Sequence, residues 1–166
     1  MKEIFDNLKR TNNNDLVLLD TCFIIDVFHH HKEKELLNKK HEFAITSFNA
    51  EELEHVIKKV KDKSIKERIR KFFKDNKAIK VLDVPVHPGN TKQEKTYVQT
   101  IDPYLAQDVP DPSDAVLIAA AIKTRSKVVT KDKHHLFTAV LEKYLKRWGI
   151  TILKDLKGLD ERPQST

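Results

Sequence analysis

An uninterrupted run of apolar residues extends from Ala115 to Ile122 in the second half of the chain. Apolar residues in direct succession show no periodicity, so the run alone is consistent with a buried strand or with a helix buried on all sides. Its flanks favour the helix, because Asp111 is a good N-cap and Pro112 then occupies the first helical position. We therefore predict a helix that begins after Asp111 and lies inside the protein.

Shorter apolar runs alternate with amphipathic segments along the rest of the chain. A run of about four to eight apolar residues predicts a buried strand, and apolar residues spaced by three and four predict a helix. The alternation of the two predicts the α/β class with a mostly parallel central sheet of about five strands. The predicted strands are 16–19, 42–46, 78–84, 127–130 and 149–153, and the other predicted helices are 23–28, 50–60, 64–74, 91–101 and 134–147. Residues 11–15 and 47–49 are interpreted as turns.

Length and cysteine content restrict the class of protein. The 166 residues suggest one domain, which is large enough to bury a core without disulfides. One cysteine allows no intrachain disulfide, so a reducing compartment is expected. The chain has no long apolar segment and no apolar signal region at its N-terminus. We therefore expect a cytoplasmic protein that does not associate with membranes.

The charge of the chain favours a polyanionic partner. Its net charge is +6 and its isoelectric point is about 9.3, which suits RNA, DNA or an acidic protein. The helix predicted at 64–74 carries many of the cations, and such a run is either a solvated face or a nucleic-acid contact. Five of the six prolines mark residues 85–112 as rich in loops, and Tyr97 within them is a candidate for base stacking or for packing.

Four acidic residues lie at the ends of predicted strands or near the starts of predicted helices. Asp20 and Asp132 follow strands, Asp114 lies in the first turn of the buried helix, and Glu52 lies near the start of another helix. The carboxyl ends of parallel strands are where α/β proteins bind ligands. The alternative for Asp111 and Asp114 is structural, because an aspartate there can cap the helix or complement its dipole.

Helical phase selects Glu52 over its neighbour Glu51. An apolar stripe on the helix 50–60 consists of Leu53, Val56, Ile57 and Val60. At 100° per residue, Glu52 lies beside the stripe and Glu51 points away from it. We therefore predict that Glu52 faces inward, and the alternative is a solvated position or a pair with His55 or Lys59.

Carboxylates gathered at one edge of a sheet repel one another unless a cation compensates their charge. Oxygen ligands without cysteine or clustered histidine select Mg²⁺ or Mn²⁺ over zinc. Such an ion generates hydroxide from bound water and stabilises charge on a phosphoryl group. The sequence therefore predicts a metal site suited to phosphodiester hydrolysis.

Four segments together resemble the PIN-domain ribonucleases. They are LLDTCFIID around Asp20, TSFNAEEL with Glu52, DPSDAVLIAAA with Asp114, and VVTKD with Asp132, and they follow the family's order. The resemblance implies a three-layer α/β/α sandwich, with one nuclease domain at 1–153 and a polar tail at 154–166. It also implies a metal-dependent endoribonuclease, in which these four carboxylates hold one or two Mg²⁺ or Mn²⁺ ions and water attacks the scissile phosphate.

The same resemblance implies secondary site residues. Thr130 is similar to the family's hydroxyl residue before the last aspartate, and Thr21 to the small polar residue beside the first. Asp111 is the alternative to Asp114 as the third acid. We choose Asp114 because the phrase DAVLIAAA is most similar to the family's pattern.

The resemblance implies an RNA substrate and leaves the protein partner open. Members of VapC type are toxins held inactive by an antitoxin, and others process ribosomal RNA, so an antitoxin, a ribosomal assembly partner and a second copy of this chain are all considered. The alternative function is a non-catalytic RNA-binding or scaffold protein that retains the fold. A structure-specific DNA nuclease related to the flap endonucleases is a further alternative.

Overall fold

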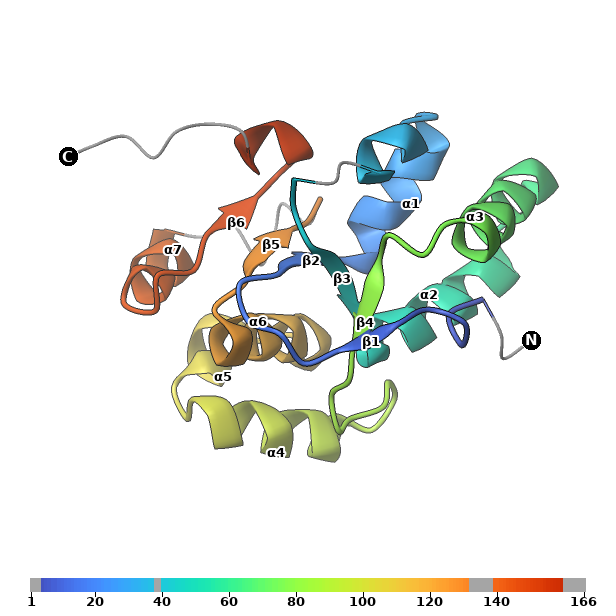
Figure 1. The fold of residues 1–166 in the computed structure, drawn as a ribbon. Helices are drawn as coiled ribbons and strands as arrows, with labels where there is room; N and C mark the ends of the chain where they lie inside the picture. The colour runs from blue at the N-terminus through green and yellow to red at the C-terminus, as the bar shows by residue number, and fades with distance from the viewer. Residues whose placement is uncertain (1–3, 38–39, 132–138, 160–166) are drawn as a thin grey trace.

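The computed structural model describes residues 4–37, 40–131 and 139–159 (Figure 1). In the described residues a parallel sheet of six strands runs through the centre, in the order β1-β4-β3-β2-β5-β6. The strands are β1 (Arg10–Thr11), β2 (Val17–Leu19), β3 (Phe43–Thr46), β4 (Lys80–Leu82), β5 (Lys127–Val129) and β6 (Ile152–Leu153). The predicted α/β class and mostly parallel sheet are therefore confirmed, with one strand more than predicted.

Helices cover both faces of the sheet (Figure 1). Along each strand, side chains point alternately to the two faces, so Leu18 and Val128 join one core cluster while Leu19 and Val129 join the other. The first cluster contains residues of α4 (Thr91–Ile101), α5 (Leu105–Asp108), α6 (Pro112–Thr124) and α7 (Ala139–Lys146). The second contains residues of α1 (Thr21–His29), η1 (Glu33–Leu37), α2 (Ser47–Lys59), α3 (Lys63–Asp75) and η2 (Leu156–Leu159). The predicted three-layer α/β/α sandwich is confirmed.

Helix α6 is the most deeply buried helix of the first core cluster. Every residue from Ala115 to Ile122 is at most 6% exposed, as the unbroken apolar run predicts. The Asp111 carboxylate caps the helix by accepting hydrogen bonds from the backbone N–H groups of Ser113 and Asp114. Its other end turns at Arg125, which adopts the left-handed conformation with φ of 52°. The predicted helix and its N-cap are confirmed.

Three local predictions were wrong. Strand β1 was missed because it is a two-residue edge strand of polar side chains, and its second residue, Thr11, begins the segment interpreted as a turn. Ser47 and its two successors are the first turn of α2, because the Thr46 hydroxyl accepts a hydrogen bond from the Asn49 N–H at 3.0 Å and caps the helix there. Val56 was predicted to face the core and is 39% exposed.

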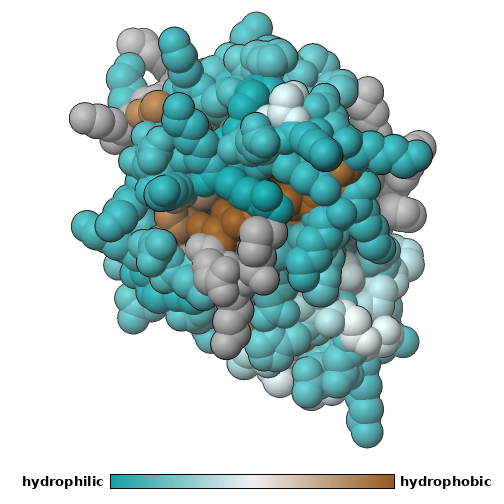
Figure 2. All heavy atoms as spheres, turned by 90° about the vertical axis from the view of Figure 1, so that its right-hand side faces the viewer, coloured by the Kyte–Doolittle hydropathy of each residue, from teal (hydrophilic) through white to brown (hydrophobic). Residues whose placement is uncertain are grey.

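Helix α3 exposes only some of its cations to solvent, since Lys66, Arg68 and Arg70 are partly buried. Ile69, Phe72 and Phe73 are buried on one side, whereas Lys71 and Lys74 are exposed on the other. Figure 2 shows the side of the molecule where α2 and α3 lie, and hydrophilic residues cover most of it around a strip of hydrophobic ones. The positions of Lys71 and Lys74 agree with the solvated-face interpretation of this basic helix.

The segment predicted as a polar tail, 154–166, contains a short ordered element within its described part. Residues Leu156–Leu159 form η2, and Leu159 is buried in the second core cluster. Among the helices in the described part of the chain, none combines the length and the apolar composition that a membrane crossing requires.

A leucine substitution in α6 tests how far stability depends on this helix. Leu117→Ala removes a side chain that is 1% exposed, and we expect a loss of about 2–5 kcal/mol in the free energy of unfolding, measured by urea denaturation. Leu37→Ala is the matched control, because Leu37 is 37% exposed and should cost much less. Equal losses in the two variants would contradict the assignment of α6 to the core.

Candidate metal centre

Asp20 stands where the central strand β2 ends and α1 begins. Its side chain is well buried, with the residue 8% exposed. One carboxylate oxygen, Oδ1, accepts a hydrogen bond from the Thr21 N–H at 2.7 Å, and Oδ2 accepts one from the Thr130 hydroxyl at 2.6 Å. Bonds from two different elements therefore fix the orientation of this carboxylate at the carboxyl edge of the sheet.

Asn49 joins Asp20 to Glu52, a role that was not predicted from the sequence. Asn49 is 1% exposed, and its Oδ1 accepts a hydrogen bond from the Thr46 hydroxyl at 2.6 Å. This bond leaves the amide nitrogen to face the acids, 3.1 Å from Oε1 of Glu52 and 3.5 Å from Oδ1 of Asp20. Interpreting residues 47–49 as a turn concealed the fact that Asn49 lies one helical turn before Glu52.

The Glu52 carboxyl is partly buried and has other acidic side chains nearby. Burial, and after it the negative charges of Asp20, Asp111 and Glu94, raise the pKa of its carboxyl to about 7, while the hydrogen bond from the Asn49 amide acts in the opposite direction. Glu51, one position earlier, instead bonds to Nδ1 of His87 at 2.6 Å. Of the two neighbouring glutamates, Glu52 is thus the one that faces the other acids.

Those of the four predicted acids that lie in the described part of the chain line one open cavity of about 520 Å³. Asp20, Glu52 and Asp114 all line it, and Asn49 and Lys131 line it as well. They come from β2, α2, α6 and the end of β5, which are distant in sequence and meet at the carboxyl edge of the sheet.

The two aspartates at the start of α6 occupy different places. The Asp111 carboxylate accepts the Ser113 N–H at 2.9 Å and the Asp114 N–H at 3.3 Å, so it acts as the helix cap. Asp114 lies in the lining of the cavity, whereas Asp111 is exposed. Asp111 still contributes negative charge to the site, because it is among the groups that raise the pKa of Glu52.

Glu94 is a further acid near the site that sequence reasoning missed. It is 3% exposed, and its Oε1 accepts a hydrogen bond from the Ser113 hydroxyl at 3.0 Å. The buried face of α4 consists of Glu94, Tyr97 and Val98. That three-and-four spacing was a usable signal, because it places a carboxylate on the inward face of an amphipathic helix.

The two threonines among the secondary candidates, Thr21 and Thr130, orient other site residues and add no charge. Thr130 is fully buried and donates to Asp20. The Thr21 hydroxyl donates to the Asn49 carbonyl oxygen and accepts from the Asn49 amide, each at 3.3 Å. The Cys22 thiol donates to Asp20 at 3.4 Å, and desolvation together with the Asp20 charge raises the pKa of this thiol to about 11. The thiol is therefore neutral at pH 7 and is a poor nucleophile.

The donor chemistry of the cavity fits a hard divalent cation. Asp20, Glu52 and Asp114 offer carboxylate oxygens, and the pKa of Glu52 is raised by burial and by nearby negative charge, both of which a bound cation would offset. Within the described residues, no three Asp, Glu, His or Cys side chains lie close enough together to form a ready set of ligands. Asp132, the fourth predicted ligand, lies outside the described residues.

Glu52→Gln tests whether the partly buried charge of Glu52, beside the other acids, destabilises the fold when no metal is bound. With a folded-state pKa of about 7, above the ordinary value near 4.5, ionisation of Glu52 destabilises the fold progressively as the pH rises from about 4.5 to above 7. In EDTA at pH 8 we therefore expect Glu52→Gln to be more stable than the parent, by on the order of 2 kcal/mol. At pH 4 the gain should vanish, because Glu52 is protonated in both states. Chemical denaturation at the two pH values measures this.

Glu51→Gln is the matched control for this experiment. It makes the same chemical change one residue earlier, at a side chain that bonds to His87 instead of facing the cavity. We expect no comparable gain for it at pH 8. If Glu52→Gln is no more stable than the parent at pH 8, or if its gain in stability is the same at pH 8 and pH 4, then Glu52 does not carry an unfavourable charge.

Comparison with known proteins agrees with this geometry. A family model described as the PIN domain matches residues 17–141. A chain in the crystal structure of VapBC2 from Rickettsia felis, bound to a DNA fragment from their promoter, is 19% identical with a TM-score of 0.54, over 82% of this chain and 96% of that one. A chain in DNA-bound VapBC from Salmonella typhimurium is 21% identical with a TM-score of 0.55, over 83% of this chain and 96% of that one. A comparison with curated proteins finds no significant match. Because the family model covers most of the sequence, the chain belongs to the PIN domain family.

Proposed function

We propose that this protein is an endoribonuclease that depends on Mg²⁺ or Mn²⁺ and hydrolyses RNA at the cavity lined by Asp20, Glu52 and Asp114. The observation that carries the proposal is the convergence of these three carboxylates at the carboxyl edge of a PIN-domain sheet. Folding energetics alone give no reason to gather acids here, because each one raises the cost of ionising the others. A function that requires a cation explains their presence.

The residues divide into ligands and groups that orient them. Asp20, Glu52 and Asp114 would hold the ion, and we propose Asp132 as the fourth ligand. When bound, such an ion supplies a nucleophilic hydroxide and stabilises negative charge on the phosphoryl group. The Thr130 hydroxyl fixes the Asp20 carboxylate, because it donates to Oδ2 at 2.6 Å.

Asn49 has the second orienting role. Its side-chain amide nitrogen donates to Glu52 at 3.1 Å, and its side-chain oxygen Oδ1 accepts from the Thr46 hydroxyl at 2.6 Å. These two hydrogen bonds together fix the rotamer of Asn49. This arrangement holds Glu52 toward Asp20 in spite of their repulsion. Lys131 also lines the cavity, and its ammonium group can contact a phosphate of the substrate.

A protein partner is part of the proposal. Two solved structures that share this fold are VapBC structures, and the sequence resembles VapC toxins, so we propose that the chain is the toxin of a toxin-antitoxin pair. Ile25 and Val56 add apolar surface to the lining beside the acids, and Val56 is 39% exposed. An antitoxin segment that covers these side chains would also block access of RNA to the cavity.

RNA cleavage by the purified chain tests the proposed activity. We expect cleavage of single-stranded RNA with Mg²⁺ or Mn²⁺ and none in EDTA. Asp20→Asn and Glu52→Gln should lower the single-turnover rate by about 100-fold or more, and Asn49→Ala by roughly 10–100-fold, because groups that orient metal ligands typically contribute that much. Glu51→Gln should retain the parent rate, and circular dichroism verifies that each variant is folded.

Three results would contradict the proposal. Cleavage in EDTA would exclude a metal-dependent mechanism, and full activity of both Asp20→Asn and Glu52→Gln would move the active site elsewhere. Binding of RNA in EDTA without cleavage under any divalent metal would favour a non-catalytic RNA-binding protein. A parallel DNA substrate distinguishes a DNA nuclease, which would cleave DNA in preference to RNA.

A further inference from the structure

A strongly basic surface lies at the opposite end of α6 from the carboxylates. The C-terminal ends of α4, α6 and α7 meet around an open cavity of about 770 Å³. Its lining includes Lys123, Arg125, Lys146, Arg147 and Trp148, which we call the basic patch. Arg125 precedes β5 and Trp148 precedes β6, so the basic patch lies at the amino edge of the sheet, whereas the acids lie at the carboxyl edge.

The charge of the basic patch is not compensated locally. No aspartate or glutamate is among the described residues that line this cavity. Its four cations make no ion pair within 4.0 Å in the described part of the chain, whereas Arg68 pairs with Glu33 at 2.6 Å and Lys80 with Glu42 at 2.8 Å. The dipoles of three helix ends favour cations nearby, but they do not account for an aromatic side chain among them.

Trp148 is the feature that points to a ligand. It is the one tryptophan of the sequence, and it is 44% exposed although its large ring would gain from burial. Its turn is fixed by hydrogen bonds to the Leu145 carbonyl oxygen from the N–H groups of Trp148 at 3.0 Å and Ile150 at 3.1 Å. Gly149 between them has φ of 68°, which a side chain would strain. An indole held on the surface beside guanidinium groups is suited to stack on an unpaired base.

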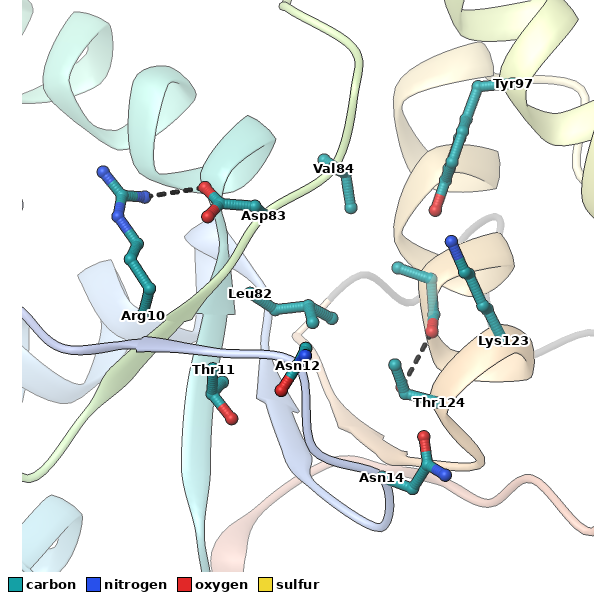
Figure 3. A pocket seen from close by; sticks show the side chains of 11 residues that line it. Arg10, Thr11, Asn12, Asn14, Leu82, Asp83, Val84, Tyr97, Lys123 and Thr124 are labelled. Atoms are coloured by element: carbon teal, nitrogen blue, oxygen red, sulfur yellow. Dashed lines mark hydrogen bonds and ion pairs between the residues drawn. The ribbon is translucent and has the colours of Figure 1, made fainter.

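The basic patch continues into a second cavity, of about 380 Å³, through the shared residue Lys123. Figure 3 shows this cavity, with the Lys123 ammonium group and the Tyr97 hydroxyl pointing toward one another and the amide side chains of Asn12 and Asn14 on another element. Burial raises the pKa of Tyr97 to about 12, so its hydroxyl remains protonated and can donate a hydrogen bond. Polar groups of this kind can contact sugars, phosphates or base edges.

The second cavity extends toward the acids. It is also lined by Asp83 and Val84, which follow β4 at the carboxyl edge of the sheet. The Val84 N–H donates to the Ser47 hydroxyl at 2.9 Å, and Ser47 begins the helix that carries Asn49 and Glu52. A nucleic-acid strand that ran through both cavities would lead from Trp148 to the carboxyl edge of the sheet at Asp83 and Val84.

The length of α6 sets a lower limit on the number of nucleotides in a nucleic-acid strand that follows this route. Thirteen residues of helix span about 20 Å at 1.5 Å per residue. At about 3.4 Å per stacked nucleotide, such a strand needs roughly six nucleotides or more. The acidic edge repels a polyanion when no metal is bound, so attraction must come from cations at a distance.

We propose that the basic patch and the adjoining cavity form a contact surface for single-stranded RNA, separate from the cleavage site. Lys123, Arg125, Lys146 and Arg147 contact phosphates, and one base stacks on Trp148. The choice of RNA as the polyanion rests on the proposed function. The binding itself does not require cleavage, so the two proposals can be tested separately.

Trp148 supplies its own reporter, because no other tryptophan contributes to the fluorescence of the chain. In EDTA, titration with an unstructured RNA of about twelve nucleotides, twice the estimated minimum, should quench this fluorescence. The quenching should saturate at the same RNA concentration as the fluorescence anisotropy of a labelled copy of that RNA. An RNA of about three nucleotides, which is too short for the route, should bind much more weakly.

Substitutions separate stacking from charge. Trp148→Ala should weaken binding about tenfold without changing its salt dependence, and Trp148→Phe should recover much of the loss because a π-face remains. Arg147→Gln should reduce the slope of log affinity against log salt by about 0.7, the value for one phosphate contact on a single strand. Lys71→Gln is the matched control, because Lys71 is an exposed cation on α3, and its slope should stay close to that of the parent.

Specific results would overturn this inference. Saturating RNA that leaves the Trp148 fluorescence unchanged would do so, as would Trp148→Ala binding as tightly as the parent. Substitutions that alter self-association in sedimentation, but not RNA affinity, would assign the basic patch to a second copy of the chain. If no metal supports cleavage while Trp148→Ala still loses RNA binding, the proposed nuclease activity fails and this inference stands.

Discussion

Parallel strands bring all their carboxyl ends to one edge of a sheet, and the chemistry of this protein depends on that constraint. It places Asp20, at the end of β2, beside the start of α2 and the start of α6. The acids from these elements then share one cavity although they are far apart in sequence. Burial and the neighbouring negative charges raise the pKa of Glu52, and the hydrogen bonds from Thr130 and Asn49 hold the carboxylates in place against their repulsion. The site is therefore assembled at a cost that a bound cation would offset.

Helix α6 connects the two charged ends of the molecule. Its N-terminus carries Asp111 and Asp114, and its C-terminus is followed by Arg125 in the basic patch. Burial on all sides fixes the helix in the core, so its two ends stay at a fixed separation. The charge at each end has the sign that the helix dipole favours, and each end has more charged residues nearby than capping requires. The chain therefore carries its acidic cavity and the basic patch at opposite ends of one buried helix.

Features with a local cause were predictable from the sequence. The unbroken apolar run fixed α6 and its cap, and the alternation of strands with helices gave the sheet. Helical phase distinguished Glu52 from Glu51, even though Val56 on the expected stripe is exposed. Asn49 and Trp148 could not be assigned, because their roles depend on contacts between distant elements or on exposure, whereas Glu94 was missed although its spacing with Tyr97 and Val98 placed it on the inward face of α4. The two polar residues of β1 likewise become a strand only because β4 lies beside them.

Direct binding of Mn²⁺ to the metal-free chain, followed by the loss of the free-ion signal in electron paramagnetic resonance, tests the central claim most directly. We expect the parent and Glu51→Gln to bind Mn²⁺ alike, and Asp20→Asn and Glu52→Gln to bind it at least about tenfold more weakly. A parent chain that binds no Mn²⁺, or a Glu52→Gln variant that binds it as tightly as the parent, would contradict the assignment of these carboxylates to a metal centre.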